Sequence, residues 1–228
     1  MELDTPAAVK APAPPEDASS RPVALPSPFT WDFTVHRAQA ISRATLQFDW
    51  PYPQGVHYDL RWTETGATEG SWAWHSRGAV SSVGLMPQRL VESRQGRDRR
   101  TINVDRAAGW VSASSTTHRE RVPVGVQDRL SWLVQLLATV RAHEVAWQAG
   151  ESLTLAVAQW DGRVALWRFV LRSGGTGMPG PWIWERAPTQ DYDAGIEVWL
   201  SPDAAFRPVR VVWRWPPHAQ ETRWEAAN

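Results

Sequence analysis

Apolar and polar residues alternate along most of the chain between about residues 29 and 225, and this period of two is typical of half-buried β-strands. In the segment Val56–Trp62, four apolar residues alternate with three polar ones. Similar short segments are separated by turn sequences such as Asp161-Gly162. The regular spacing predicts about ten to twelve antiparallel strands, with a break in the pattern at Gly84-Leu85-Met86-Pro87.

One segment, at about residues 126–142, departs from the alternation and predicts a long amphipathic α-helix. Its apolar residues recur three or four positions apart and share one side of a helix: Leu130, Leu133, Val134, Leu137 and Val140. A single helix among strands can bury its apolar side against the face of a sheet. We therefore expect a mainly β fold, in which a curved antiparallel sheet or open β-barrel wraps this helix.

The start of the chain differs in composition from the rest. Residues 1–28 contain seven prolines among Ala, Ser and Glu, which predicts a disordered, extended linker with little to bury. Residues 29–228 then form a single β-rich domain, long enough to bury a core without disulfides. The first residues lack the positively charged start and the apolar stretch of a signal peptide, so we expect either a cytoplasmic protein or one whose signal or anchor is missing from this sequence.

Composition excludes several functions. The 24 basic and 24 acidic residues cancel, so no net field would attract nucleic acid. The chain has no cysteine, which excludes disulfides, thiolate catalysis and cysteine metal sites. It also has no run of about 18 apolar residues, so we expect no membrane-spanning segment.

The 16 tryptophans permit two interpretations. Partly exposed Trp side chains can stack on flat or apolar ligands, whereas Trp residues in alternating strands fill the core of a sheet. Because most of them lie in alternating segments, we expect core filling to account for the majority. The candidates for a ligand-lining role lie on two strands and on the helix: Trp62, Trp72, Trp74 and Trp132.

Polar candidates gather near the start of the helix. Asp128 is expected to cap the helix, and the alternative is a polar site at its mouth that includes Arg129. The arginines of the segment Arg94–Arg100 have the chemistry to bind a phosphate or carboxylate. Glu92 and Asp98 partly neutralise that segment, so we interpret it as a solvated hairpin tip.

Catalytic and metal-binding patterns are sparse. The six histidines include no His-Glu-x-x-His motif, and His118 with Glu120 provides only two potential ligands, so we expect neither metal nor cofactor. Gly-x-Ser-x-Gly and Ser-x-x-Lys motifs are absent. Asp191 and Asp193 form a carboxylate pair that is suited to acid–base chemistry, or simply point the same way in an extended segment.

Several stretches together resemble a bacterial envelope family known as the domain of unknown function 3108. They span residues 45–215 and comprise Gly84–Pro87 with Arg89 and Glu92, Gly125–Ser131 with Gln135-Leu136, Tyr192-Asp193, Ile196–Pro202, and Pro208–Arg210. The resemblance implies a secreted or anchored protein with a proline-rich lead before the domain. The resemblance assigns no catalytic residues to this chain. The sheet-and-helix pattern of the family is also similar to the open barrels of lipoprotein carriers, and this is an analogy of fold alone.

Three functional hypotheses follow. The first is a non-enzymatic, periplasmic or envelope-associated binding module. It would hold an acyl chain, another apolar ligand or a peptide segment in a groove between sheet and helix, lined by the four tryptophans with Asp128 and Arg129. The second is a hydrolase of an envelope glycan or ester, which needs His118, Glu120, Asp128 or Asp191 to converge. The third is a scaffold that pairs a sheet edge with an envelope protein. The oligomeric state stays open.

Overall fold

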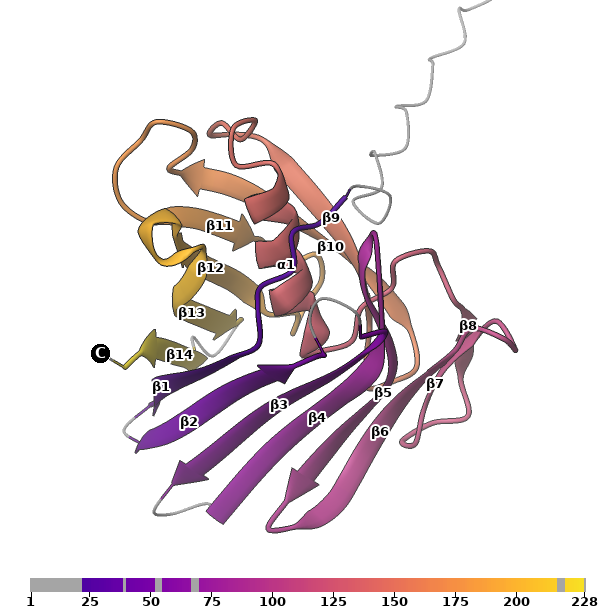
Figure 1. The fold of residues 1–228 in the computed structure, drawn as a ribbon. Helices are drawn as coiled ribbons and strands as arrows, with labels where there is room; N and C mark the ends of the chain where they lie inside the picture. The colour runs from indigo at the N-terminus through magenta and orange to yellow at the C-terminus, as the bar shows by residue number, and fades with distance from the viewer. Residues whose placement is uncertain (1–21, 39, 52–54, 67–69, 217–219, 228) are drawn as a thin grey trace, which may run out of the picture.

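The computed structural model describes residues 22–38, 40–51, 55–66, 70–216 and 220–227. These residues form 14 strands, one α-helix and a short 3₁₀ helix (Figure 1). The elements, in chain order, are β1 (Phe29–Arg37), β2 (Ala40–Asp49), β3 (His57–Gly66), β4 (Gly70–Ser81), β5 (Gly84–Arg94), β6 (Arg97–Asp105), β7 (Trp110–Ala113), β8 (Arg119–Arg121), α1 (Ser131–Ala142), β9 (Ser152–Ala158), β10 (Val164–Ser173), β11 (Trp182–Arg186), β12 (Gly195–Ser201), η2 (Pro202–Ala204), β13 (Arg207–Trp215) and β14 (Gln220–Ala226).

All the strands belong to one antiparallel sheet in the order β8-β7-β6-β5-β4-β3-β2-β1-β14-β13-β12-β11-β10-β9. The predicted mainly β fold with one large antiparallel sheet is therefore confirmed. The first and last strands pair with each other, as Val35 does with Trp224. The sheet of the described residues does not close, because β8 and β9 are its two edges. Contacts outside the ladder link these edge regions, including a hydrogen bond of 2.9 Å from the Val164 amide to Glu120 Oε2.

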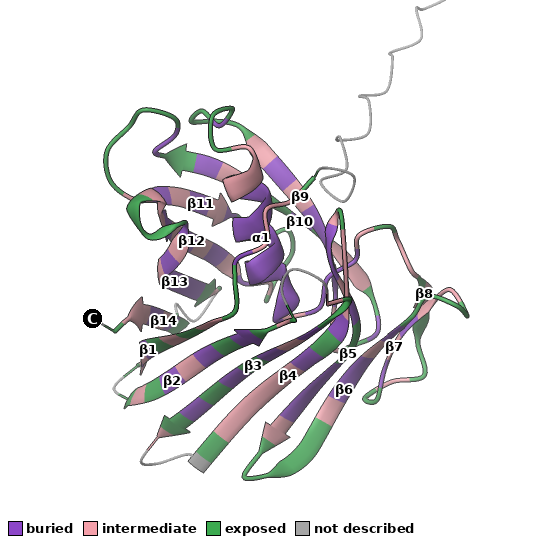
Figure 2. Cartoon of the chain, viewed as in Figure 1, coloured by how far each residue is buried: buried purple, intermediate pink, exposed green. Residues whose placement is uncertain are grey.

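The helix α1 is shorter than expected and more deeply buried. It begins at Ser131, five residues after the expected start at 126, because Gln127 forms a β-bridge with Val157 of β9. All ten residues from Ser131 to Val140 are buried, so the helix has no solvated side along this length (Figure 2). The apolar stripe is buried as expected, and other parts of the chain cover the remaining sides.

One of those covering parts is the segment 22–28, the end of the expected linker, which runs across α1 before β1 (Figure 1). The Ala24 amide donates a hydrogen bond of 3.0 Å to the Ala138 carbonyl oxygen. Pro26 is buried, and its carbonyl oxygen accepts a hydrogen bond of 3.0 Å from Trp50 Nε1. These contacts make the segment part of the fold, while the rest of the expected linker, residues 1–21, lies outside the described residues.

Tryptophan and phenylalanine rings fill the core. Eight of the 16 tryptophans are buried. The Trp132 ring of α1 stacks on Phe169 of β10 with a centroid distance of 5.4 Å, and it meets Trp213 of β13 edge-on at 6.4 Å. Trp213 also contacts the Trp224 ring of β14, and Trp224 in turn stacks on Trp62 of β3 with a centroid distance of 3.7 Å. The stacked rings therefore link the helix to strands on both sides of the β1–β14 pair.

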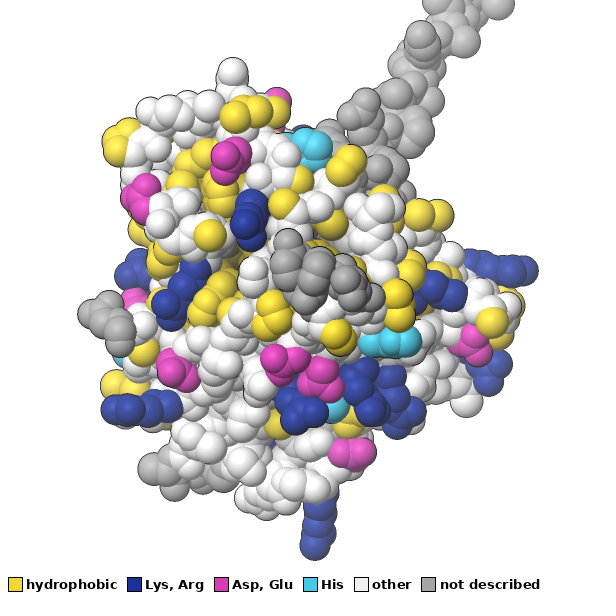
Figure 3. All heavy atoms as spheres, in the orientation of Figure 1, with side chains coloured by type: hydrophobic (Ala, Val, Ile, Leu, Met, Phe, Trp, Pro, Cys, Tyr) yellow, Lys and Arg dark blue, Asp and Glu magenta, His cyan; other side chains and the backbone are white. Residues whose placement is uncertain are grey.

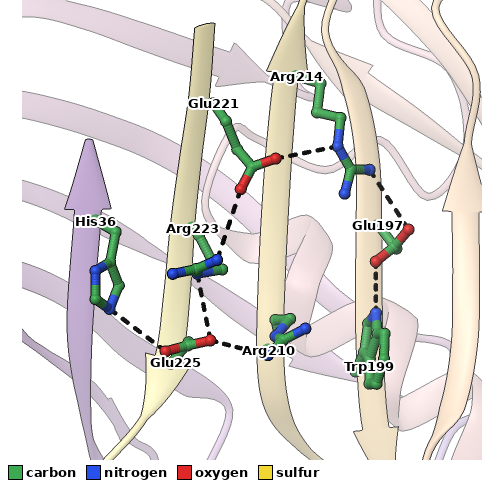
Figure 4. A network of polar contacts seen from close by, with 8 residues as sticks. All are labelled: His36, Glu197, Trp199, Arg210, Arg214, Glu221, Arg223 and Glu225. Carbon is green, nitrogen blue, oxygen red and sulfur yellow. Dashed lines mark hydrogen bonds and ion pairs between the residues drawn. The ribbon is translucent and has the colours of Figure 1, made fainter. Parts of the chain in front are cut away.

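The opposite face of the sheet is polar. Across β1, β14, β13 and β12, ion pairs and hydrogen bonds connect side chains on neighbouring strands, and Arg210 lies 2.9 Å from Glu225 (Figure 4). On the face shown in Figure 3, charged side chains gather over β2–β5. Partly exposed ion pairs of this kind each contribute at most about 1 kcal/mol, so the packed inner face supplies most of the stabilisation.

The sequence Gly84–Pro87 does not interrupt the sheet, so that part of the strand prediction was wrong. It forms the start of β5, where the register against β4 shifts near Gly78. Gln135 of α1 binds this point, because its Oε1 accepts a hydrogen bond of 2.9 Å from the Leu85 amide and its Nε2 donates one of 3.0 Å to the Val83 carbonyl oxygen. The turn between β4 and β5 therefore fixes the helix to the sheet.

We predict that Gly84→Ala lowers the free energy of unfolding by about 3 kcal/mol. Gly84 has a φ of +113°, and a Cβ there would overlap the Gln135 amide. Gly96→Ala is the matched control, because its φ of +73° is also positive but nothing lies within 4 Å of the added Cβ. It is expected to cost about 1 kcal/mol from backbone strain. Urea denaturation of both variants checks the difference, and equal losses would contradict the role given to Gln135.

Candidate functional site

Three cavities of the described residues adjoin one another at the ends of several strands, and Trp215 lines all of them. Their volumes are about 320, 360 and 390 Å³. We refer to them together as the Trp215 groove. Its aromatic and apolar lining residues are Ile41, Trp72, Pro188, Tyr192, Ile196, Trp215 and Pro216.

The antiparallel topology places this groove. β1 and β13 end where β2, β4 and β14 begin, so residues far apart in the sequence meet at one end of the sheet. Trp213 and Trp215 point to the same face of β13 because they are two residues apart. Trp213 is buried in the core, whereas Trp215 at the end of the strand is only half-buried and stays accessible.

A buried carboxylate holds one wall of the groove. Glu64 on β3 is only 5% exposed and pairs with the Arg37 guanidinium through both its oxygens, with a distance of 2.8 Å between Nη2 and Oε2. Ser42 donates a further hydrogen bond to Glu64. The Arg37 guanidinium lies 5.1 Å from the centre of the Trp72 ring, which is a cation–π distance. These contacts fix Trp72 and Arg37 in place before any ligand arrives.

A second ion pair supports the opposite wall. Arg186 of β11 is 2% exposed and lies 2.5 Å from Asp193 Oδ2, which also accepts hydrogen bonds from Thr189. Burial acts to raise the pKa of Asp193, but the hydrogen bonds from Arg186 and Thr189 outweigh it, so the pKa lies below its usual value. Asp193 is therefore a structural counter-ion rather than a proton donor near neutral pH.

The four candidate tryptophans fall into two groups. Trp62 and Trp132 are 2% exposed and belong to the core. Trp72 is half-buried and lines the groove, and the half-buried Trp74 meets it edge-on at 5.8 Å. The space between helix and sheet, where the sequence predicts a ligand, is occupied around Trp132 by aromatic rings of β10 and β13.

Asp128 is buried and connects the start of α1 to β4. Its Oδ1 accepts hydrogen bonds of 2.8 and 2.7 Å from the amides of Leu130 and Ser131, so it satisfies amides at the helix start, although the N-cap residue is Leu130 and not Asp128. Its Oδ2 accepts one of 2.5 Å from Ser76, whose hydroxyl also lies 2.8 Å from the Tyr58 hydroxyl. Burial raises the pKa of Asp128 despite these hydrogen bonds, and it also raises the pKa of Tyr58.

Arg129 is half-buried and follows Asp128 directly. Its Nη1 donates a hydrogen bond of 2.7 Å to Gln159 Oε1, and its guanidinium lies 5.2 Å from the centre of the Trp167 ring. Burial, together with the nearby cations Arg100 and Arg186, lowers the pKa of Arg129 to about 10.

The side chains required by the hydrolase hypothesis do not all converge in the described part of the chain. The exposed His118 lies 3.9 Å from the half-buried Glu120, whereas Asp128 is buried beside Ser76. Asp191 is exposed in the loop before β12. In the described ranges, no group of three His, Cys, Asp or Glu side chains is arranged to hold a metal ion.

The predicted hairpin tip lies around Gln95 and Gly96, between β5 and β6. Arg100 pairs with Glu92 through two hydrogen bonds of 2.9 Å, and its guanidinium lies 4.3 Å from the centre of the Trp160 ring. The arginines of this segment therefore do not act as one free cationic cluster.

A basin of about 640 Å³ lies on another part of the surface, beside Tyr58, His57 and Arg77. At its edge, Asp59 Oδ2 and His75 Nε2 form a hydrogen bond of 2.7 Å, and Asp59 also pairs with Arg61. Burial acts to raise the pKa of Asp59, but these partners outweigh it and lower the pKa. Asp59, His75 and Arg61 satisfy one another, and we favour the Trp215 groove because two half-buried indoles, Trp72 and Trp215, line one of its cavities.

Comparison with known proteins identifies the kind of fold. No protein-family model and no curated protein matches the chain. Among solved structures, it is similar to a β-barrel-like protein of the domain of unknown function DUF1849 from Brucella abortus, with a TM-score of 0.52 and 11% sequence identity. The similarity covers 90% of this chain and 98% of the other.

At that identity the likeness shows the fold alone. It supports a β-barrel-like domain of unknown function, and it does not support the 3108 family specifically. The described part of the chain contains no helix that is long and apolar enough to cross a membrane.

Sequence reasoning missed most of the groove. Arg37, Glu64, Arg186 and Trp215 were not among the candidates, although all lie at or near strand ends. The one available signal was the charge of Glu64 and Arg186, because each falls at an inward position of an alternating strand. A charged residue at such a position needs a partner, but the sequence does not name it.

We predict that Asp128→Ala lowers the free energy of unfolding by about 3 kcal/mol, because it leaves two amides and the Ser76 hydroxyl without an acceptor in a buried site. Asp128→Asn is the matched control and is expected to cost about 1 kcal/mol or less, since its side-chain carbonyl can accept the same amide hydrogen bonds. Chemical denaturation measures both values, and an equally severe loss in both would contradict the role given to the amide hydrogen bonds of Asp128.

The raised pKa of Asp128 also predicts a pH dependence. Because the folded protein holds the proton more tightly than the unfolded chain, the stability contributed by this group is present below its ordinary pKa of about 3.9 and is lost as pH rises through the raised pKa. The stability of the wild type minus that of Asp128→Asn is therefore expected to fall over this range. Denaturation curves from about pH 4 to pH 7 test the sign, and a rising difference would refute it.

Proposed function

We propose that this protein is a non-enzymatic binding module that holds a small apolar ligand in the Trp215 groove. The observation that carries the proposal is the pair of half-buried indoles, Trp72 and Trp215, which line the same cavity of about 320 Å³. Cavities of this size with aromatic walls and a few fixed polar groups are typical small-ligand sites. An acyl chain or a flat apolar group fits this chemistry.

The proposal moves the ligand away from the position that the sequence predicts. In our interpretation the curved sheet wraps α1, and the aromatic rings between them leave the ligand to bind at the strand ends. The buried state of Trp62 and Trp132 supports this move, because both rings are already packed against other aromatic side chains. Trp72 keeps the ligand-lining role, with Trp74 behind it.

The two alternatives have less support. A hydrolase would need the carboxylates and His118 to converge, but among the described residues His118 pairs only with Glu120, and no hydrogen bond or ion pair joins this pair to Asp128 or Asp191. A scaffold would need a free sheet edge, but β8 has only three residues, all charged, and Gln127 covers part of β9 through two backbone hydrogen bonds of 2.8 Å. The periplasmic or envelope location implied by the resemblance remains part of the proposal.

The test uses N-phenyl-1-naphthylamine, a neutral apolar fluorophore whose emission rises on burial. We predict saturable binding to the wild type and about tenfold weaker binding to Trp215→Ala, because an aromatic contact contributes roughly 1.4 kcal/mol. Trp199→Ala is the matched control, since Trp199 is a half-buried indole on the outer face of β12, bonded to Glu197 (Figure 4).

Fluorescence titration gives the affinities, and near-ultraviolet circular dichroism checks that each variant is folded. Unchanged binding by folded Trp215→Ala, or an equal loss in Trp199→Ala, would overturn the assignment of the groove. A wild type that shows no saturable binding would overturn the proposed function itself.

A further inference from the structure

The arginines that line the groove all have carboxylate partners. Arg37 pairs with Glu64, Arg186 with Asp193, and Arg214 with Glu197 and Glu221. A further pair, Arg100 with Glu92, lies beside Trp74, because Trp74 Nε1 also donates a hydrogen bond of 2.9 Å to Glu92. The carboxylate in each of these pairs is already bound to an arginine, so none of them is the direct partner of Arg129.

Arg129 lies near the pairs of Arg100 and Arg186, and it has no carboxylate partner of its own among the described residues. Its one side-chain acceptor there is the neutral amide of Gln159 at 2.7 Å, and its buried Nε–H has no acceptor. The neighbouring Asp128 does not serve as its counter-ion, because the oxygens of Asp128 bind Ser76 and the two helix amides. The cation is therefore held in a partly buried position without an anion.

The Trp167 ring connects Arg129 to the groove. The guanidinium carbon of Arg129 lies 5.2 Å from the ring centre, and that of Arg186 lies 4.7 Å from it. The two guanidinium groups are therefore within about 10 Å of each other. Arg186 itself lines the groove together with Trp215. Arg129 therefore shares one buried ring, Trp167, with a side chain that lines the groove.

Electrostatics favour an anion at this point. Burial lowers the pKa of Arg129 to about 10, and the cations Arg100 and Arg186 add to this shift, while their partners Glu92 and Asp193 only partly oppose it. A carboxylate beside Arg129 would relieve both the burial cost and the repulsion, and arginine presents it with a planar set of donors. The same site gives a neutral head group no such gain.

We propose that Arg129 binds the anionic head group of the ligand whose apolar part lies in the Trp215 groove. The ligand class is an amphipathic anion, of which a medium-chain carboxylate is the simplest case. The inference rests on the proposed function, because it assumes an apolar ligand in that groove. It adds that the charge of the ligand is negative and that one named arginine selects it.

The experiment compares decanoate with 1-decanol, which have ten-carbon chains and differ in the charge of the head group. Competition against N-phenyl-1-naphthylamine gives the affinity of each for the full-length protein. We expect the wild type to bind decanoate at least tenfold more tightly than 1-decanol at low salt, with the ratio falling as salt is added. Arg129→Gln is expected to lose at least tenfold in decanoate affinity and to keep its affinity for 1-decanol.

Arg168→Gln is the matched control, because Arg168 is exposed on β10 and bonds to Ser152. It is expected to bind both compounds as the wild type does. Unchanged decanoate affinity in folded Arg129→Gln, or an equal loss in Arg168→Gln, would overturn the anion site while 1-decanol binding still supports the proposed function. Absence of binding by both compounds would overturn the two proposals together.

Discussion

The fold depends on how the start of α1 is tied to the sheet through buried polar contacts. The carboxylate of Asp128 accepts hydrogen bonds from two amides at the start of α1 and from Ser76 of β4. The side chain of Gln135, one turn after the first residue of the helix, binds backbone groups at the β4–β5 turn. Gln127 adds a backbone bridge to β9, at the far edge of the sheet. Because buried polar groups must be satisfied, these contacts allow one position of the helix and bring opposite edges of the sheet to the same segment. Two stretches noted for their family resemblance, Gly84–Pro87 and Gly125–Ser131, thus have a structural role.

Once the helix is fixed, the aromatic core follows from it. Trp132 packs between β10 and β13, and the linked rings beyond it reach Trp62 on β3. Large rings fill the interior efficiently, so the sheet does not need a closed ladder between β8 and β9 to exclude water. The segment 22–28 completes the covering of α1 from the other side. Space for a ligand therefore lies where strands end and packing stops, beside Trp215.

The chemistry at that end combines apolar walls with arginines. Ion pairs hold the walls, as Glu64 does for Arg37, so these charges position side chains more than they attract ligands. Arg129 differs because its nearest acceptor is neutral. A site with aromatic walls and one uncompensated cation is suited to an amphipathic anion, and this gives the proposed binding module a chemical preference. The β-barrel-like protein of Brucella abortus is similar in fold and does not decide the ligand.

The sequence alone determined the mainly β class, most strand positions and the buried stripe of α1, because these depend on local periodicity. It also placed Asp128 at the start of the helix, where its carboxylate accepts amide hydrogen bonds within three residues, although the N-cap residue is Leu130. It missed β8, whose residues Arg119–Arg121 have no apolar alternation, and it misread Gly84–Pro87, whose place in β5 depends on Gln135 some 50 positions away. Only the tertiary structure decided where the Trp215 groove lies and that Arg129 has no carboxylate partner among the described residues. Strand pairing, and not the order of residues in the chain, determines which carboxylate lies beside each arginine.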